Sequence, residues 1–323
     1  MGKPVVPLLP RPERRGLRGG LSMTLLLIAR AGGWLRARRR CSVASMQRQR
    51  TWLITGTSSG FGRAMTEIVL SRGDRVAATV RETDAMDALK RTFGDALWVA
   101  SLDVTDAGAV RRVVDEAFQE LGRIDVVVSN AAYGLFGAAE EVSDDQIRRL
   151  IDTNLVGSIH VIRAALPHLR AQSGGRVVQV SSEGGQIAYP NFSLYHASKW
   201  GIEGFVESVA RETAPLGIEF TIVEPGPAQT GFGAGLVVAP AMDAYEKTPS
   251  GEIRHAIASG SFGLKGDPHK VASAIVDSVD RTPAPRRLIL GSDAFQRVRA
   301  ALVERVAALD AQEEIARSTD LAP

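Results

Sequence analysis

The sequence is poor in the residues that build disulfide or metal frameworks. Its 323 residues include one cysteine, Cys41, so no disulfide can form within the chain, and this usage is typical of a reducing compartment. We therefore expect a cytoplasmic protein. The five histidines are scattered without metal-ligand spacing, and we expect no metal site. The apolar run Leu25 to Ala29 is too short to span a bilayer. What remains is 45% hydrophobic content, enough to bury one substantial core.

Excess positive charge is confined to the first 45 residues. They carry ten Lys or Arg against one acid, Glu13, which gives +9; since the whole chain carries +3, residues 46–323 carry −6. The high pI therefore indicates neither a nucleic-acid partner nor a membrane surface. We expect residues 1–45 to be a disordered extension, or an upstream extension from a mis-assigned start with Met46 as initiator. A signal peptide or organellar presequence over Met23 to Ser45 is the alternative.

Apolar runs alternate with helical patterns from residue 51 onward. Runs such as Val126 to Val128 are continuous, which is typical of a parallel sheet covered by helices on both faces. The alternation predicts a single α/β domain over residues 46–323, with a doubly wound, Rossmann-type parallel sheet of seven strands. The predicted strands are 52–54, 75–80, 97–101, 125–129, 176–180, 218–224 and 286–290, and the predicted helices are 62–72, 84–92, 106–121, 144–170, 195–213 and 268–280.

The first predicted strand runs into a glycine-rich turn, Thr55 to Gly62, and an amphipathic helical pattern follows. Glycines there allow a tight turn, approach of backbone N–H groups to a pyrophosphate, and close packing of helix on strand. The spacing differs from G-x-G-x-x-G, and such a turn needs no ligand. The strand before it and the helix after it nevertheless favour a dinucleotide site. The residues expected to contribute are Gly56, Ser58, Ser59, Gly60, Phe61 and Gly62.

Tyr195 and Lys199 lie one helical turn apart, with Ser182 thirteen residues before the tyrosine. The pKa of a tyrosine hydroxyl is normally about 10. An ammonium on the same helix face would favour the phenolate and lower that pKa, so that the tyrosine acts as acid or base near neutral pH. Ser182 follows the run 176–180, where its hydroxyl would reach a substrate carbonyl or alcohol. An ordinary surface pair is the alternative for Tyr195 and Lys199.

Several motifs together resemble the short-chain dehydrogenase/reductase superfamily, in its branch with single-domain subunits. In order, they are Thr55 to Gly62, Asn130-Ala131-Ala132, Asn154, Ser182, Tyr195, Lys199 and Pro225-Gly226. The resemblance covers residues 51 to at least 230, and Ala132 departs from the family's Asn-Ala-Gly. Residues 130–136 and 286–292 look similar to bacterial oxidoreductases related to hydroxysteroid and retinol dehydrogenases, which does not imply a steroid substrate.

This resemblance implies a catalytic tetrad. Tyr195 would be the acid/base, Ser182 would orient the substrate, Lys199 would bind the nicotinamide ribose and bias the tyrosine pKa, and Asn154 would hold a water in a proton relay. The further cofactor contacts that it implies are Asp103, Asn130, Ala131, Pro225, Gly226 and Thr230. For Asp103 the alternative is that it only caps the next helix.

The end of the second predicted strand bears on the choice of cofactor. NAD enzymes place an acid there to hydrogen-bond the ribose 2′-OH. Aligned with the family, Val80 takes the position of that acid and Arg81 the next one. Arg81 can bind a 2′-phosphate through charge-assisted hydrogen bonds, so we expect NADP(H) in preference to NAD(H). The alternative is that Arg81 is merely solvated and Glu82 binds the ribose.

These motifs lead us to expect an alcohol dehydrogenase or carbonyl reductase that transfers a hydride between NADP(H) and a secondary alcohol, ketone or aldehyde. A catalytically idle NADP-binding sensor or regulator is the alternative, and the complete tetrad argues against it. A reductase of an imine or quinone on the same scaffold stays open. The resemblance also implies a homodimer or homotetramer through helices 144–170 and 195–213, although those apolar faces could be buried within one subunit.

The long connection 231–262 is expected to be a substrate loop. Its apolar side chains suggest a medium-sized, mainly apolar substrate. Those expected to form the wall are Phe232, Leu236, Val237, Met242, Tyr245 and Phe262, with Tyr133 and Phe136. Glu183, Tyr189 and Phe192 resemble another wall of the family's cleft, or are ordinary loop packing. His196 is interpreted as a plain helix residue.

Overall fold

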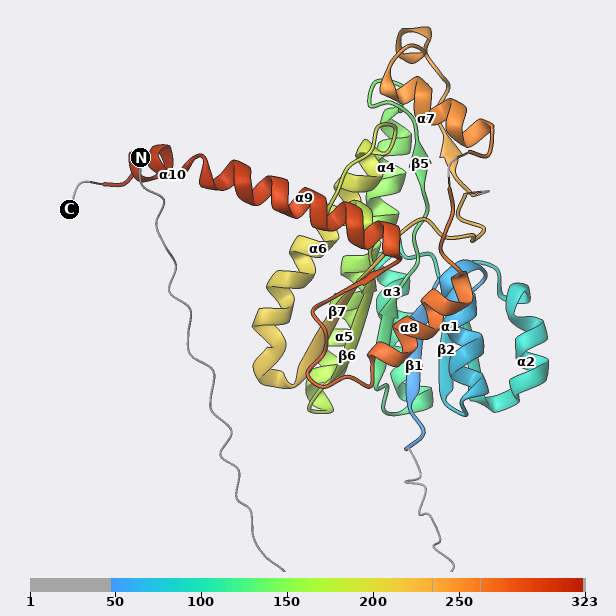
Figure 1. The fold of residues 1–323 in the computed structure, drawn as a ribbon. Helices are drawn as coiled ribbons and strands as arrows, with labels where there is room; N and C mark the ends of the chain where they lie inside the picture. The colour runs from blue at the N-terminus through green and yellow to red at the C-terminus, as the bar shows by residue number, and fades with distance from the viewer. Residues whose placement is uncertain (1–47, 234, 262, 322–323) are drawn as a thin grey trace, which may run out of the picture. The chain divides into compact units, whose positions relative to one another are not determined.

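The computed structural model describes residues 48–233, 235–261 and 263–321, and the expectations for residues 1–45 lie outside these ranges. At its centre is a parallel sheet of seven strands in the order β3-β2-β1-β4-β6-β7-β9 (Figure 1). They are β1 (Thr51–Thr55), β2 (Arg75–Val80), β3 (Leu97–Ser101), β4 (Val126–Ser129), β6 (Gly175–Val180), β7 (Ile218–Pro225) and β9 (Arg287–Leu290). The predicted doubly wound sheet is confirmed, and each strand lies within one residue of its predicted bounds.

Helices cover both faces of this sheet (Figure 1). In chain order, the helices of the described residues are α1 (Gly60–Ser71), α2 (Asp87–Phe93), α3 (Ala107–Leu121), α4 (Asp144–Ile151), α5 (Ser158–Ala171), α6 (Ser193–Thr213), α7 (Pro249–Ala258), α8 (Pro268–Ser278), α9 (Ser292–Asp310) and α10 (Glu313–Arg317). The predicted helices are all present. α7, α9 and α10 were not predicted.

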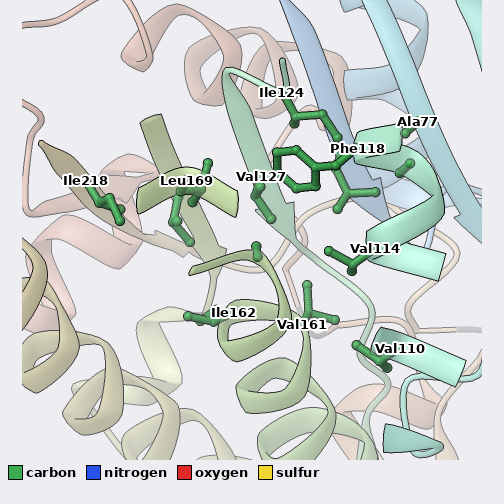
Figure 2. Close-up of a cluster of buried hydrophobic side chains, with 14 of the residues drawn as sticks. Ala77, Val110, Val114, Phe118, Ile124, Val127, Val161, Ile162, Leu169 and Ile218 are labelled. Carbon is green, nitrogen blue, oxygen red and sulfur yellow. The ribbon is translucent and has the colours of Figure 1, made fainter. Parts of the chain in front are cut away.

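Alternate residues of each strand point to opposite faces of the sheet, as the two-residue period of a strand requires. Leu53 of β1 and Val127 of β4 lie in a core shared with α3, α5 and α6, part of which Figure 2 shows. Ile54 and Val128, one residue further along, lie in a second core shared with α1 and α8. All four side chains are fully buried, and each such burial stabilises the fold by about 1.5–3 kcal/mol. Burial on both faces explains why these strands are continuous apolar runs.

The strand order reverses between β1 and β4, because β2 and β3 extend the sheet beyond β1 while β6, β7 and β9 extend it beyond β4. In open parallel sheets a crevice forms outside the carboxyl ends of the strands at this point, and ligands bind there. The glycine-rich turn follows β1, and Asn130 follows β4. Both motifs therefore lie at the reversal.

The predicted helix 144–170 is interrupted. α4 and α5 are joined by a π-helical segment, Asp152–Gly157, so that the three form one long helix with a widened central turn. Single π-helical turns are frequent at functional sites. Asn154 lies in this segment and is fully buried.

The predicted substrate loop contains regular structure. β8 (Val237–Val238) pairs in parallel with β5 (Leu135–Phe136), and α7 follows it. Figure 1 shows α7, in orange, beyond the carboxyl ends of the central strands, near β5 and α4. This structure was not predicted, because the partner of β8 is remote in sequence and no local pattern indicates the pairing.

The C-terminal helix α9 begins against the body and then leaves it (Figure 1). Ala294 and Val298 are fully buried, whereas Leu302 and Leu309 are 43% and 69% exposed. Without a buried stripe along its length, the segment lacked the period that marks a packed helix. Within the described ranges, no helix is long and apolar enough to cross a membrane.

Candidate active site

Backbone contacts close the glycine-rich turn and leave no room for side chains. Gly56 has a φ of +70°, and a Cβ there would lie 2.9 Å from the Ala131 Cα. A Cβ at Gly62 would lie 2.3 Å from the Gly56 carbonyl oxygen. The N–H groups of Gly56 and Thr57 donate to the Thr79 carbonyl of β2, at 3.0 and 3.2 Å. Only glycine fits this approach of turn, helix and neighbouring strands.

Asn130 fastens β4 to the same turn. Its Nδ2 donates to the carbonyl oxygens of Thr55 and Gly56, at 2.8 and 3.1 Å. The Thr55 hydroxyl in turn accepts the backbone N–H groups of Asn130 and Ala131, at 2.9 and 3.1 Å. Because the Asn130 amide donates to the protein itself, it holds the shape of the turn, and its contact with a cofactor stays a prediction.

The N-terminus of α1 opens at the carboxyl end of β1. Its N-cap, Ser59, makes no side-chain capping bond, and the first turn carries no acid. Ser58 and Ser59 are exposed, and Phe61 is half-buried. A Cβ added at Gly60 would lie 3.9 Å from the Cβ of Thr230, so the segment after β7 passes close to the turn. Uncapped N–H groups of this kind bind phosphate.

The end of β7 is set by its neighbours in the C-terminal region. Pro225 is buried, and the Gly226 N–H donates to the Leu290 carbonyl of β9 at 2.9 Å. A Cβ at Gly226 would lie 2.9 Å from the Cβ of Ala294 on α9. Pro225 and Gly226 therefore fix the direction in which the chain leaves the sheet toward Thr230.

Arg81 and Asp103 are exposed just after β2 and β3, whereas Val80 at the end of β2 is buried. The Asp103 carboxylate accepts the N–H and the hydroxyl of Thr105, at 2.9 and 2.8 Å. These bonds are the main cause of its lowered pKa, to which the charge of Arg81 contributes. Asp103 thus shapes the turn that leads to α3, and its contact with a cofactor stays a prediction.

Ser182, Tyr195 and Lys199 come together at the carboxyl end of β6, next to the strand reversal. Lys199 is only 2% exposed. Its Nζ lies 5.6 Å from the centre of the Tyr195 ring and donates to the Val180 carbonyl at 3.1 Å. The Ser182 hydroxyl is close enough to Tyr195 to change its pKa. The helical spacing and the strand end therefore converge as the sequence predicted.

The expected acidity of Tyr195 is not found, and this prediction was wrong in direction. Burial raises the pKa of Tyr195 to about 12; the Ser182 hydroxyl opposes the increase, and the charge of Glu183 adds to it. Burial also lowers the pKa of Lys199 to about 8, although the charge of Glu203 counteracts the shift. The sequence showed the ammonium but not the desolvation that Lys199 and Tyr195 share. At neutral pH, the Tyr195 hydroxyl therefore keeps its proton.

Asn154 joins the tetrad to the loop after β4. Its Oδ1 accepts the Tyr133 N–H at 3.0 Å, and its Nδ2 donates to the Tyr133 carbonyl at 2.8 Å and to the Ser198 hydroxyl at 3.4 Å. Ser198 donates to the Tyr195 carbonyl at 2.7 Å. Since both ends of the amide are used, the side chain positions α6 and the loop. The water that Asn154 was expected to hold stays a prediction.

Aromatic rings surround Tyr195. The centres of the Phe192 and Phe232 rings lie 6.2 and 5.7 Å from the centre of the Tyr195 ring, both edge-on. Phe136 meets Phe192 at 5.2 Å. The loop after β7 therefore brings at least one of its predicted wall residues, Phe232, to the tyrosine, and the rings make the surroundings of the hydroxyl apolar.

The remaining predicted wall residues differ in exposure. Leu236 lies against the loop after β4, since a Cβ at Gly134 would lie 2.3 Å from its Cδ2. Val237 and Met242 are 40% and 39% exposed. Tyr133 and Tyr245 are partly buried. Phe262 lies outside the described residues.

A buried ion pair fastens the substrate segment. The Glu141 side chain is fully buried, and Arg254 of α7 donates to both of its carboxylate oxygens at 2.8 Å. The same oxygens accept the N–H groups of Met242 and Ala138, each at 2.8 Å. Tyr245 adds an exposed hydrogen bond to Glu140, at 2.9 Å. Glu141 thus ties the segments 138–141 and 242–254 together, a role that no sequence motif indicated.

Glu183 and His196 also have contacts that the sequence did not predict. The buried carboxylate of Glu183 binds Arg297 of α9 at 2.9–3.1 Å and accepts the Tyr189 hydroxyl at 2.8 Å. It therefore anchors α9 instead of lining the cleft by its charge. His196 is buried and bonded through both ring nitrogens to the segment after Ser182. The two adjacent glycines at 184 and 185 were the available signal of close packing there.

Comparisons with known proteins agree with this fold. Residues 50–238 match the family model for short chain dehydrogenases. The chain is 35% identical to oxidoreductase BOA17 of Botryotinia fuckeliana over 246 residues, 76% of this chain and 90% of that protein. A short-chain dehydrogenase from Streptomyces avermitilis has 38% identity and a TM-score of 0.79, covering 85% of this chain and 99% of that one.

A more distant structure shares the fold. It is an alcohol dehydrogenase from Thermococcus sibiricus in complex with 5-hydroxy-NADP, with 24% identity and a TM-score of 0.62 over 75% of this chain and 96% of that one. The extent of the family match and the identity to BOA17 decide the relationship. This chain belongs to the short-chain dehydrogenase/reductase superfamily of oxidoreductases.

Proposed function

We propose that the protein transfers a hydride between NADP(H) and a secondary alcohol, ketone or aldehyde, as an alcohol dehydrogenase or carbonyl reductase. The observation that supports this most strongly is the meeting of Ser182, Tyr195 and Lys199 at the carboxyl end of β6. A protein that only senses its cofactor needs neither a buried proton donor nor an apolar wall around it.

The residues present fit a nicotinamide dinucleotide. The uncapped, acid-free N-terminus of α1 would bind the pyrophosphate, since the turn before it keeps side chains out of the way. Lys199 would bind the nicotinamide ribose, and Thr230 would contact the carboxamide. When bound, the dinucleotide supplies or accepts the hydride.

Proton transfer falls to Tyr195. With its pKa raised to about 12 it keeps its proton at neutral pH, and it would donate to a carbonyl oxygen as negative charge develops there. Ser182 accepts the Gly184 N–H at 3.1 Å, so its own hydroxyl proton points elsewhere, toward Tyr195, and would make a second bond to that oxygen when a substrate is present. Lys199, with a pKa of about 8, is largely charged at pH 7 and would stabilise the phenolate left behind. These states favour the reducing direction.

The substrate that we propose is medium-sized and mainly apolar. Support comes from the rings around Tyr195, namely Phe192 and Phe232, and from Phe136 behind them. The preference for NADP(H) is supported by the exposed Arg81 and the buried, uncharged Val80 at the end of β2.

Three further proposals concern the whole chain. Residues 46–323 would form the catalytic domain, with a substrate segment over about residues 231–262. The protein would be cytoplasmic. It would form a homodimer or homotetramer through α4–α5 and α6, and Trp200 of α6, which is 45% exposed, supports an interface on that helix.

A panel of apolar ketones, aldehydes and secondary alcohols, followed by NADPH absorbance, tests the reaction. We expect Tyr195→Phe to keep its affinity for NADPH and to lose about 10²–10⁴-fold in kcat. Thr92→Val removes an exposed hydroxyl that bonds to the Ala88 carbonyl within α2 and should leave the rate unchanged. A near-native rate in Tyr195→Phe would refute the assignment. Tight NADPH binding without turnover of any compound would favour the sensor.

Kinetic comparison of the two cofactors tests the preference. Loss of a charge-assisted contact to the 2′-phosphate in Arg81→Ala should raise KM for NADPH about 10- to 100-fold and leave KM for NADH unchanged. Arg91→Ala, which removes another exposed arginine, is the matched control. If the native protein uses NADH as well as NADPH, the proposed preference for NADP(H) is wrong. A selective loss of NADH use in Glu82→Ala would assign the ribose to Glu82 instead.

A further inference from the structure

His196, the residue after the proposed proton donor, spans the loop that follows Ser182. It is 6% exposed. Its Nδ1 lies 3.0 Å from the Gly184 carbonyl oxygen, and its Nε2 lies 2.9 Å from the Tyr189 backbone nitrogen. One ring on α6 thus holds both ends of the segment 184–189.

These two partners fix the protonation state of the ring. A carbonyl oxygen only accepts and a backbone N–H only donates, so Nδ1 carries the proton and Nε2 is the acceptor. The neutral tautomer satisfies both bonds. In the imidazolium, Nε2 would carry a proton as well and would face the Tyr189 N–H, so that two donors would meet. Burial, which lowers the pKa of His196, is consistent with the neutral form. The ring cannot be rotated without losing both bonds.

Gly184 connects this ring to Ser182. The Gly184 carbonyl accepts from His196, and the Gly184 N–H donates to the Ser182 hydroxyl oxygen at 3.1 Å. The ring packs directly on Gly184, because a Cβ there would lie 2.5 Å from the His196 Nδ1. The position of Gly184 is therefore set by His196 from one side and transmitted to Ser182 on the other.

The bond from Gly184 determines what Ser182 can do. A hydroxyl oxygen that accepts a hydrogen bond from one direction must point its own proton in another. With the Gly184 N–H in place, the Ser182 proton is directed away from its own loop and toward Tyr195, where a substrate oxygen would meet both hydroxyl groups. Without that bond the hydroxyl can turn back to nearby carbonyl groups.

We propose that His196 is a positioning residue, which holds Gly184 so that Ser182 acts as a hydrogen-bond donor to the substrate oxygen. The inference rests on the proposed role of Ser182 and adds a third residue of α6 to the site, after Tyr195 and Lys199. Tyr195 and His196 are adjacent, so the same helical turn would set the proton donor and, through the loop, the second donor.

Two substitutions of His196 distinguish the hydrogen bonds of its two ring nitrogens, since each can keep one bond and removes the other. Asparagine places an amide N–H near the position of Nδ1 and can keep the bond to Gly184, whereas glutamine reaches the position of Nε2 and can keep only the bond to Tyr189. We expect His196→Asn to retain most of kcat, and His196→Gln and His196→Ala to lose about tenfold, with KM for NADPH changed less than about twofold. The substrate is the compound of the panel that the native protein reduces fastest. His269→Asn, at an exposed histidine, is the control.

A double-mutant cycle distinguishes positioning from general loss of stability. If His196 acts through Ser182, His196→Ala should lower kcat in the native background but cause no further loss in Ser182→Ala, since coupled residues are not additive. Additive losses, or a more active His196→Gln than His196→Asn, would overturn the inference. If Ser182→Ala itself leaves kcat unchanged, the proposed role of Ser182 fails instead.

Hydrogen exchange of the Gly184 amide gives a readout that needs no substrate. In protein labelled with ¹⁵N-glycine, this amide should exchange faster in His196→Gln than in His196→Asn, because only the glutamine variant releases Gly184. Equal protection in both variants contradicts the proposal. The comparison does not depend on His196→Ala, which is the variant with the largest cavity.

Discussion

The proposed cofactor and substrate regions are held in place in different ways. On the cofactor side, residues 51–62 are held by backbone hydrogen bonds to the neighbouring strands and by glycines that let turn, helix and β4 touch. On the proposed substrate side, β8 pairs with β5 through the backbone, and residues 242–258 after it are held by side chains, above all by the buried pair of Glu141 and Arg254. A backbone-built site depends on where a Cβ can fit, and a side-chain-built site depends on charge and ionisation. The two sides should therefore respond to different perturbations.

The largest effect is expected at Gly56. Alanine there must adopt a φ of +70°, which costs about 1–2 kcal/mol, and its Cβ must displace the Ala131 backbone, which adds about 1–3 kcal/mol. We expect Gly56→Ala to lower the free energy of unfolding by about 4 kcal/mol and to abolish measurable NADPH binding. Chemical denaturation and fluorescence titration with NADPH measure the two effects.

Gly73 provides the control for this prediction. Its φ is +86°, but a Cβ there would meet nothing within 4 Å. Gly73→Ala should therefore lower the free energy of unfolding only by the cost of the positive φ, about 1–2 kcal/mol, and should bind NADPH normally. If the two variants are equally destabilised, close approach is not what the turn requires, and the cofactor side is not built as described.

The substrate side should fail at Arg254. Arg254→Leu leaves the Glu141 carboxylate buried with only its two backbone donors, and breaking such a pair costs about 3 kcal/mol. The cost should appear locally, as faster hydrogen exchange over residues 236–258 and a higher KM for the carbonyl substrate, with NADPH affinity unchanged. Lys247→Leu removes an exposed cation of the same segment and should change neither. A loss of NADPH affinity in Arg254→Leu would show that the two sides are not separable.

The same contrast explains how far the sequence predicted the molecule. The strands were predicted within one residue because both of their faces are buried, as Leu53 and Ile54 illustrate. The convergence of Ser182, Tyr195 and Lys199 was predicted because helical spacing and a strand end fix it locally. The ion pair between Glu141 and Arg254 was not predicted, because the two residues lie more than a hundred positions apart and neither belongs to a motif. The pairing of β5 with β8 was missed for the same reason.

The pKa of Tyr195 shows a second limit. The i,i+4 ammonium is visible in the sequence, but burial acts on both groups and depends on everything packed around them. Helix α9 shows the opposite case, since residues 300–309 are rich in alanine and leucine, and their intrinsic helix propensity was available as a signal. The helical spacing of Tyr195 and Lys199 can be read from the sequence, whereas the desolvation that shifts the pKa of both groups cannot.

The smallest effect, and the sharpest contrast, is expected with acid. Burial tends to raise the pKa of Glu141, but the hydrogen bonds from Met242, Ala138 and Arg254 outweigh it, so that the pKa lies below its ordinary value of 4.5. A carboxyl group with a lowered pKa stabilises the folded state fully above its unfolded value, and this stabilisation is lost as the pH falls through the folded value. Protection of residues 236–258 should therefore be constant down to about pH 4.5 and then decrease.

The segment 53–62 contains no ionisable side chain, so its protection, corrected for the intrinsic pH dependence of exchange, should stay constant over the same range. In Glu141→Gln the carboxyl group cannot titrate, and the acid-induced loss over residues 236–258 should disappear, leaving lower but constant protection. Exchange measured by mass spectrometry between pH 7 and pH 3.5 follows both segments in one sample. If residues 53–62 and 236–258 lose protection together in the native protein, acid unfolds the whole domain, and the Glu141 carboxyl group does not act on the substrate segment alone. If only the substrate segment responds, ionisation of one buried carboxylate controls one side of the cleft and not the other.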